Sequence, residues 1–294
     1  MKIGVIVPQG WTGEYKGWNP VDAWQRTRAV AKQSEALGFE SIWLFDHFHT
    51  VPRPTLEITF EAFTSLAALA AETTRVRLGH IVLCAAYRNP ALTTKMISTL
   101  DVISAGRAEL GLGAGWKRDE WRAYGYGFPD APERLAILKD TLEVAQAMMT
   151  DDRATYSGEQ RHVDGAINRP RPVQQPRIPI MVGGNGPNVT WRLAARYADE
   201  LNLDGMTPSE VADALPVIRA RCEEIGRDPA SLAVSVHVWW EQITQAGQER
   251  AEMFAGYREL GVSRVIGLVR DATDSDEALE RWAADARAGG AELA

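Results

Sequence analysis

The chain has 294 residues, which is long for one ordinary domain. Its hydrophobic content of 45% and charged content of 24% are ordinary for a globular protein and exclude a disordered or collagen-like chain. The net charge is −7 with both signs interspersed, and no cluster of Lys or Arg offers a track for nucleic acid. We therefore expect a globular protein that does not bind nucleic acid.

The first ten residues hold only a short apolar run, 3–7, before Pro8 and Gln9. A secretory signal needs a longer apolar core, and a membrane-spanning helix needs about 20 apolar residues, which we find nowhere in the sequence. The two cysteines, Cys84 and Cys222, follow neither a disulfide framework nor a metal-binding spacing. These features predict a cytoplasmic protein with reduced thiols and no membrane partner.

From its start to residue 112 the chain alternates between apolar runs that predict strands and amphipathic runs that predict helices. Gly38 ends the first helix, and Pro90 lies in the first turn of the third, where its missing N–H is tolerated. The predicted elements in order are strand 3–7, helix 22–37, strand 41–45, helix 60–72, strand 76–84, helix 90–104 and strand 108–112.

After Gly115 the alternation loosens before it resumes. The segment 133–149 predicts a helix, 155–158 and 161–164 predict a small surface hairpin, and a Pro-rich extended stretch runs to residue 179. The remaining predicted elements are strand 180–182, helix 188–197, strand 200–203, helix 208–225, strand 233–239, helix 248–260, strand 264–269 and helix 276–288.

Eight strand–helix units in one series predict parallel strands that close into an α/β fold of the (β/α)8, or TIM, barrel type. A doubly wound open sheet is the competing architecture, but it typically uses about five or six strands. The barrel would be a single domain, 1–294, with an insertion at about 115–179 after strand four. We expect this insertion to cover the mouth of the active site.

Asp46 and His47 follow the strand 41–45 at its carboxyl end, where α/β folds bind their ligands. An imidazole oriented by a neighbour is suited to general base or charge-stabilising chemistry. His47 could also be a satisfied buried residue that Asp46 merely orients. A metal site built from Asp46, His47 and His49 is disfavoured because adjacent residues rarely point at one ion.

Two glycine-rich turns, 111–115 and 183–187, follow predicted strands. Glycine lets the backbone approach a phosphate, and a helix that begins after the turn adds positive potential. The second turn runs into a helix start at Pro187 and Asn188 and is the better predicted anion site. Its alternative interpretation is a tight strand–helix turn without a ligand, and the first turn matches a dinucleotide motif only loosely.

Strand ends are rich in glycine, aromatic and imidazole groups but poor in paired carboxylates. A glycosidase needs two converging carboxyl groups, and Asp46 has no obvious partner. A metal hydrolase needs several ligands from different strands, and only His47 and His80 are candidates. Aromatic residues at the strand ends could instead stack a flat ligand: Trp116, Trp239 and Trp240.

A series of longer motifs runs through the first two thirds of the chain. They are 43–48 (WLFDHF), 66–79 (LAALAAETTRVRLG), 87–91 (YRNPA), 100–107 (LDVISAGR), 110–116 (LGLGAGW), 170–174 (PRPVQ), 183–186 (GGNG) and 194–199 (AARYAD). Together and in this order they resemble the luciferase-like monooxygenase superfamily. The resemblance extends to about Asn202 and then thins to the alternation of strands and helices.

The resemblance implies a barrel that binds coenzyme F420, a deazaflavin, or alternatively reduced flavin mononucleotide (FMN). The sequence is closer to the F420-dependent branch, in which the imidazole at the His47 position lies against the deazaflavin ring. In that branch the end of strand three, here Cys84 and Ala85, forms a bulge with a cis peptide. The implied cofactor-binding residues are Asp46, His47, Cys84, Ala85, Gly113, Ala114, Gly115, Trp116, Gly183, Gly184, Asn185 and Gly186.

One position departs from the sugar-phosphate dehydrogenases of this branch. They carry a proton-donating Glu directly after the strand-four glycines, where this chain has Trp116. No Lys-rich set for a substrate phosphate stands out either, so we do not expect glucose 6-phosphate as the substrate. The aromatic residues that would bind an apolar or aromatic substrate instead are Trp11, Trp116, Trp239 and Trp240.

The resemblance therefore predicts an oxidoreductase that transfers a hydride between F420 and a small organic molecule. His47 would stabilise charge or relay a proton, with Asp46 orienting it, and no metal would take part. With reduced FMN the same cavity would make a monooxygenase, which is the alternative function. A barrel that binds flavin without catalysis is the alternative of another class. Homodimers are common in the superfamily, so we expect a homodimer.

Overall fold

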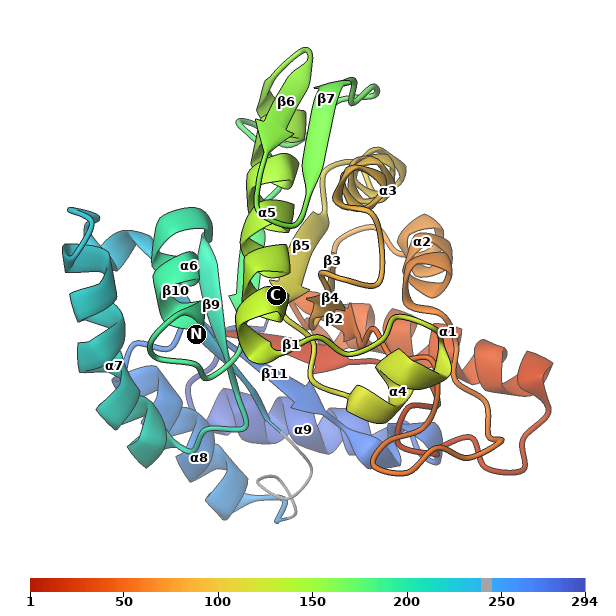
Figure 1. Cartoon of the computed structure of the whole chain (residues 1–294). Helices are drawn as coiled ribbons and strands as arrows, with labels where there is room; N and C mark the ends of the chain where they lie inside the picture. The colour runs from red at the N-terminus through yellow and green to blue at the C-terminus, as the bar shows by residue number, and fades with distance from the viewer. Residues whose placement is uncertain (239–244, 294) are drawn as a thin grey trace.

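A computed structural model describes residues 1–238 and 245–293 of the chain. In this part, eight parallel strands close into a barrel through the ring order β1–β2–β3–β5–β8–β9–β10–β11, with β11 paired to β1 (Figure 1). The strands are β1 Lys2–Ile6, β2 Ser41–Leu44, β3 Arg77–His80, β5 Ala108–Gly113, β8 Ile180–Gly183, β9 Glu200–Asp204, β10 Ala233–Val238 and β11 Arg264–Leu268. The predicted TIM barrel is confirmed.

Helices cover the outside of the barrel, and side chains cap several of them. The Asn19 and Asn89 side chains accept hydrogen bonds from the first turns of α1 and α3, and Thr207 and Glu210 form a capping box on α7. The long helices are α1 Pro20–Leu37, α2 Ala62–Glu72, α3 Pro90–Ile103, α5 Ala131–Thr150, α6 Thr190–Tyr197, α7 Pro208–Glu223, α8 Gln248–Glu259 and α9 Glu277–Ala288. None of the helices that the structure describes is long and apolar enough to span a membrane.

Large side chains fill the barrel interior where glycine leaves room. Trp43 on β2 is fully buried, and a methyl group on Gly79 of the neighbouring β3 would lie 2.2 Å from its ring. On β1, the other neighbour of β2, Gly4 leaves similar space beside the same indole. The interior is therefore a packed core, and a ligand can enter only at an end of the barrel.

The insertion contains the predicted hairpin and a short helix that was not predicted. The hairpin is formed by β6 Ala154–Ser157 and β7 His162–Ala166, and Asp140 of α5 accepts hydrogen bonds from Tyr156, Gln160 and Arg161. These contacts fold the hairpin back along α5, and Figure 1 shows it at the end of the molecule away from α4 Arg118–Ala123.

The expectation that the whole insertion covers the mouth is wrong. The loop before α4 reaches the cavity, whereas none of the described residues 118–179 lines it.

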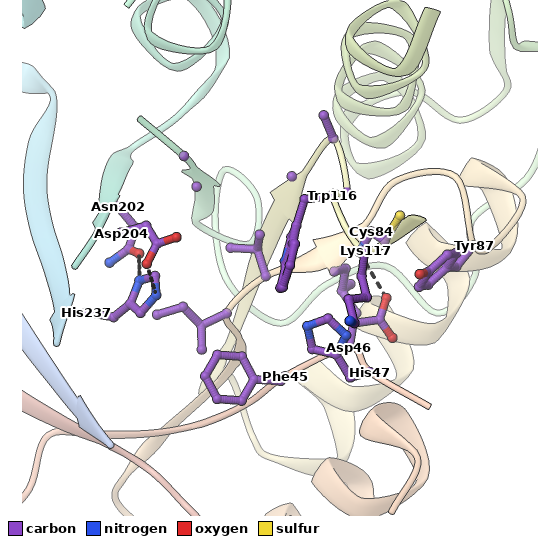
Figure 2. A pocket seen from close by; sticks show the side chains of 18 of the residues that line it. Phe45, Asp46, His47, Cys84, Tyr87, Trp116, Lys117, Asn202, Asp204 and His237 are labelled. Atoms are coloured by element: carbon purple, nitrogen blue, oxygen red, sulfur yellow. Dashed lines mark hydrogen bonds and ion pairs between the residues drawn. The ribbon is translucent and has the colours of Figure 1, made fainter. Parts of the chain in front are cut away.

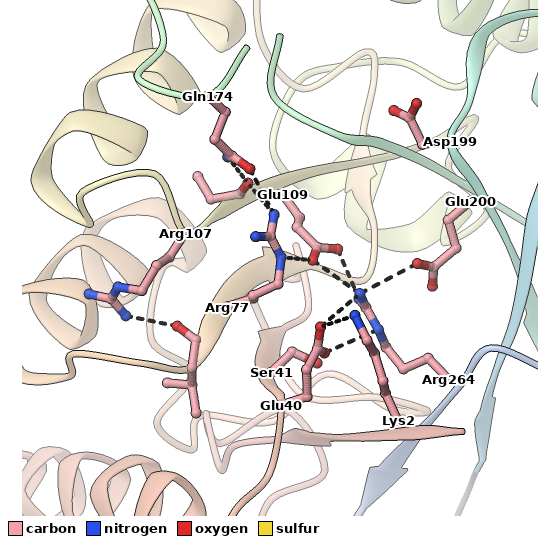
Figure 3. Close-up of polar contacts among 12 residues, drawn as sticks. Lys2, Glu40, Ser41, Arg77, Arg107, Glu109, Gln174, Asp199, Glu200 and Arg264 are labelled. Carbon is pink, nitrogen blue, oxygen red and sulfur yellow. Dashed lines mark hydrogen bonds and ion pairs between the residues drawn. The ribbon is translucent and has the colours of Figure 1, made fainter. Parts of the chain in front are cut away.

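The amino ends of the strands meet at a buried network of ionic side chains (Figure 3). Arg264 donates to both carboxylate oxygens of Glu109 at 2.8 and 3.1 Å, and its guanidinium also lies 3.3 Å from Glu40 and 3.5 Å from Glu200. Arg77 makes a further ion pair with Glu109. Since this end of a barrel carries stability rather than chemistry, we assign the network a structural role.

The third strand is interrupted before it reaches the cavity. β3 ends at His80, and β4 (Leu83–Cys84) resumes the pairing with β5 after a cis peptide between Ile81 and Val82. The resemblance placed this peptide at Cys84–Ala85, so that prediction is wrong by three residues. Pairing of Leu83 and Cys84 with β5 keeps these residues in regular strand geometry and leaves the irregular backbone to 81–82.

Candidate active site

A cavity of about 280 Å³ lies at the carboxyl ends of the barrel strands. Polar side chains face each other across it, and aromatic rings lie between them (Figure 2). The polar residues on one side are Asp46 and His47, those on the other side are Asn202, Asp204 and His237, and the intervening rings are Trp116 and Phe45. This is the end of the barrel at which the sequence predicted a site.

Most of the predicted cofactor residues line this cavity: Asp46, His47, Cys84, Gly113, Ala114, Gly115, Trp116, Gly183 and Gly184. Ala85, Asn185 and Gly186 are outside its lining. Of the predicted substrate residues, Trp11 and Trp116 line the cavity. Trp239 and Trp240 lie outside the described residues.

His47 is held by a carboxylate that the sequence did not indicate. Its Nδ1 lies 2.8 Å from Oε2 of Glu120, a fully buried residue of α4. The ring of Trp11 stacks on the imidazole at a centroid distance of 5.3 Å. Because a carboxylate only accepts hydrogen bonds, Nδ1 carries the proton, and in the neutral ring Nε2 keeps its lone pair.

Glu120 gathers further donors around the same carboxylate. The backbone N–H of Phe48 donates to Oε1 at 2.7 Å, and the hydroxyl of Tyr87 donates to Oε2 at 3.0 Å. Burial raises the pKa of Glu120, but His47, Phe48 and Tyr87 together hold that pKa below its ordinary value. Glu120 is therefore an ionised orienting group for His47. The nearby His49 has its Nε2 3.7 Å from Oε1.

Asp46 does not orient His47, which corrects the expected pairing. Its Oδ2 accepts from the backbone N–H of Cys84 at 2.9 Å, and Arg88 binds both carboxylate oxygens at 2.8 Å. Arg88 also contacts Glu61 at 3.0 Å. The Asp46 side chain thus holds the end of β4 beside β2. These bonds fix the position of this wall of the cavity.

Cys84 lines the cavity as a protonated thiol. Burial raises its pKa to about 12, and the negative charge of Asp46 acts in the same direction. Its Sγ atom occupies the space beside Gly115, where a Cβ would lie 2.5 Å from the sulfur. Cys84 therefore contributes shape and an apolar surface, and it is not a nucleophile at neutral pH.

The glycines of β5 and β8 accommodate the interrupted third strand. A Cβ on Gly113 would lie 2.6 Å from Cγ2 of Val82, and one on Gly183 would lie 2.9 Å from its Cγ1. A Cβ on Gly111 would collide with the carbonyl of His80. These glycines let Val82 form the floor of the cavity, so the pattern that resembled a phosphate-binding motif has a packing role here.

The turn after β8 retains features of an anion site. Gly184 has φ +130°, a conformation that favours glycine, and α6 begins at Thr190 rather than at the expected Asn188. Within the described residues, no side chain caps the α6 N-terminus, and although the N–H of Trp191 donates to the carbonyl of Gly186, the other N–H groups of the first turn can bind an anion. Gly184 and Thr190 both line the cavity.

The Asn185 side chain makes two hydrogen bonds to the protein backbone. Its Oδ1 accepts from the N–H of Asp204 and its Nδ2 donates to the carbonyl of Asp204, both at 2.8 Å. This pair of bonds fastens the glycine-rich turn to the end of β9. A contribution of Asn185 to a cofactor would therefore come from its backbone.

The far wall of the cavity is a polar cluster on β9 and β10. Parallel pairing places Asn202 beside Ser235 and Asp204 beside His237, and alternation along the strands points these side chains the same way. His237 Nδ1 lies 2.7 Å from Asn202 Oδ1, and its Nε2 lies 2.9 Å from Asp204 Oδ1. The imidazole is buried, whereas the Asp204 side chain is 49% exposed.

Glu120, Asp204 and His237 are among the lining or orienting groups that sequence reasoning missed. Ser235 and His237 alternate with valines in the strand segment AVSVHV, which indicates two polar side chains on one face. That alternation could have identified His237. Glu120 lies in a six-residue helix with mixed charges, and its sequence carries no comparable signal.

Comparison with known proteins identifies the family of the chain. The family model for luciferase-like monooxygenases matches residues 1–293. The F420-dependent glucose-6-phosphate dehydrogenase of Microbacterium testaceum is 30% identical over 275 residues, which cover 85% of this chain and 80% of that protein.

Two solved structures share the barrel. One is an F420-dependent secondary alcohol dehydrogenase in complex with an F420–acetone adduct, with a TM-score of 0.76, 20% identity, and coverage of 96% of this chain and 98% of that one. The other is the oxygenating constituent of 3,6-diketocamphane monooxygenase from Pseudomonas putida in complex with FMN, with a TM-score of 0.76, 16% identity, and coverage of 100% and 99%. At these identities the structures show the fold alone.

Proposed function

Because the chain belongs to the luciferase-like monooxygenase family, we propose that it is an F420-dependent oxidoreductase. The reaction is hydride transfer between the deazaflavin and a small, mainly apolar organic substrate. The named activity of the Microbacterium testaceum relative supports F420, and the aromatic wall formed by Trp11, Phe45 and Trp116 supports the apolar substrate.

The proposal rests on the tautomer of His47. Glu120 fixes the proton on Nδ1, so Nε2 is left to accept or return a proton on the cavity side. Aromatic rings on either side of the imidazole, Trp11 and Trp116, limit the access of water. A hydride acceptor or donor on this side of the cavity would meet an oriented acid–base group.

The cavity fits a planar cofactor with a phosphate-bearing tail. Ile81 and Val82 supply an apolar floor, and the uncapped N-terminus of α6 beside Gly184 supplies donors for an anion. When bound, F420 would supply the two-electron hydride chemistry at its ring. The chain's own part is to hold the ring against this floor, exclude water, and present His47.

FMN-dependent oxygenation is the second candidate function. The same floor and anion site would accept reduced FMN, and the family's name describes monooxygenases. His47 would then act on an oxygenated substrate, with the same tautomer set by Glu120.

The two candidates are separated by anaerobic titration of the purified protein with F420 and, separately, with reduced FMN. Cofactor fluorescence reports F420 binding, and stopped-flow reoxidation reports the flavin. We expect tight F420 binding and weak FMN binding. The reverse preference would contradict the proposal and assign an oxygenase, whereas binding of neither would contradict both candidates.

Replacing Glu120 by glutamine should lower turnover with F420 by about 10- to 100-fold. The glutamine side chain is nearly isosteric, but its amide N–H can donate to Nδ1 of His47 and shift the proton to Nε2. The base that faces the cavity would then be lost while the ring stays in place. Steady-state kinetics measure the loss, and F420 fluorescence should show an affinity changed by less than about threefold.

Glu143→Gln is the matched control for this variant. Glu143 lies on α5 and accepts a hydrogen bond from the hydroxyl of Tyr197 at 2.5 Å, away from the cavity. The control replaces a carboxylate by an amide, as in Glu120→Gln, at a glutamate that also accepts a hydrogen bond from a tyrosine. Equal turnover in Glu120→Gln and Glu143→Gln would show that Glu120 does not set the state of His47.

A further inference from the structure

The predicted cofactor residues and the polar far wall occupy different halves of the barrel. The interrupted strand, the glycine turns and the α6 N-terminus belong to β3, β4, β5 and β8. Asn202 and Asp204 lie on β9, which is four places from β2 in the eight-membered ring and therefore diametrically opposite the strand that precedes His47. Figure 2 shows this separation across the cavity. A cofactor placed as proposed leaves the β9–β10 wall to the substrate.

Hydrogen bonds fix which groups this wall presents. Asn202 Nδ2 donates to Ser235 Oγ at 2.9 Å, so Asn202 Oδ1 faces His237 Nδ1. Since Asp204 lies at Nε2, both ring nitrogens of His237 have acceptors. The His237 ring is therefore in polar contact through both of its nitrogens, and it is buried behind the half-exposed Asp204 carboxylate. A ligand at this wall therefore meets a carboxylate rather than a cation.

Cations that could bind a substrate anion are engaged elsewhere. Of the residues that the structure places around the cavity, Lys117 is the single lysine, and none is an arginine. The Lys117 ammonium donates to the carbonyl of Pro52 at 2.7 Å and pairs with Asp119 at 3.0 Å. An anionic substrate at the β9–β10 wall would lose its hydration without gaining a cationic partner there, which is unfavourable.

We propose that Asp204, held by His237 and Asn202, is the substrate-specificity residue of the cavity. It selects substrates that carry a neutral or cationic hydrogen-bond donor, such as a hydroxyl or amino group, on an apolar body, and it disfavours phosphates and carboxylates. The assignment of this wall to substrate depends on the proposed function. The charge preference of the β9–β10 wall does not, and it can be measured without F420 when inorganic phosphate occupies the anion site at the α6 N-terminus.

The test uses three ligands with one aromatic body: benzyl alcohol, benzylamine and benzoate. Isothermal titration calorimetry near neutral pH measures their binding to the full chain, with and without F420. We expect the alcohol and the amine to bind at least about tenfold more tightly than benzoate, because both can donate a hydrogen bond to the Asp204 carboxylate whereas benzoate has no donor and carries the same charge. In Asp204→Asn this preference should fall below about threefold.

Asp164→Asn in the exposed hairpin strand β7 is the control and should keep the wild-type preference. Asp204→Glu should restore it, and Asp204→Ser replaces Asp204→Asn if melting curves show that the latter does not fold. Benzoate binding as tightly as the alcohol in the wild type, or an unchanged preference without the carboxylate, would overturn the inference. Failure to bind F420 in the same preparation would overturn the proposed function alone.

Discussion

His47→Ala should lower turnover with F420 by about 10²- to 10⁴-fold, the usual contribution of a positioned acid–base group. The imidazole is the one described side chain at this wall whose proton position is set by a buried carboxylate and whose other nitrogen is left for a substrate. The affinity for F420 should change by less than about tenfold, since the floor and the anion site remain. Pre-steady-state hydride transfer and fluorescence titration measure the two quantities separately.

His162→Ala is the control, because His162 is exposed on β7 of the hairpin and away from the cavity. It should match the wild type in both measurements. If His47→Ala turned over substrate at the wild-type rate, the role assigned to the imidazole would be wrong. If it lost F420 binding and turnover equally, His47 would be a cofactor-binding residue instead.

Glu109→Gln should destabilise the protein by about 3–5 kcal/mol, the cost of leaving a buried ion pair without one partner. Glu109 is the carboxylate that binds both Arg264 and Arg77, and it is almost fully buried. Glutamine offers one acceptor oxygen and no charge, so Arg77 and Arg264 both lose a charged partner. Equilibrium urea denaturation at pH 7 measures the change in unfolding free energy.

Glu200→Gln is the matched variant in the same network and should change stability by less than about 1 kcal/mol. Burial raises the pKa of Glu200 and the charges of Glu109 and Glu40 act in the same direction, whereas Arg264, at 3.5 Å, lowers the pKa without overcoming burial. A neutral amide there removes a disfavoured charge. Equal destabilisation by Glu109→Gln and Glu200→Gln would contradict this distinction.

The pH dependence of the two variants should differ in sign. Arg264 and Arg77 overcome the effect of burial and lower the pKa of Glu109 below its ordinary 4.5. Its stabilisation is therefore present above about pH 4.5 and is lost as the pH falls further, so the deficit of Glu109→Gln should shrink in acid. The pKa of Glu200 is raised above 4.5, so its contribution is lost as the pH rises, and Glu200→Gln should gain relative to the wild type.

Local patterns in the sequence determined the barrel, and the structure confirms it. Apolar runs of strand length, amphipathic runs of helix length and the Gly38 and Pro90 punctuation act over a few residues, so they can be read without the fold. Parallel strands then place every strand end on one face. For that reason Asp46, His47 and the glycine turns could be assigned to one site.

Only the tertiary structure decided which of these residues act together. Asp46 and His47 are adjacent in sequence, yet Arg88 binds the first and Glu120 the second. The glycines that suggested a phosphate site mainly make room for Val82, 31 and 101 residues before Gly113 and Gly183. Contacts over such separations depend on strand order and register, which leave no periodic trace in the sequence.

The β9–β10 wall shows most clearly what the sequence determines and what only the tertiary structure determines. Alternation in β10 places Ser235 and His237 on one face, and this much follows from the sequence. That the face meets Asp204 and lies across from His47 follows from the closure of the ring. The sequence by itself therefore determined the barrel and its active end, because these depend on local periodicity. The tertiary structure decided the partners and protonation of each side chain, because these depend on contacts between distant segments.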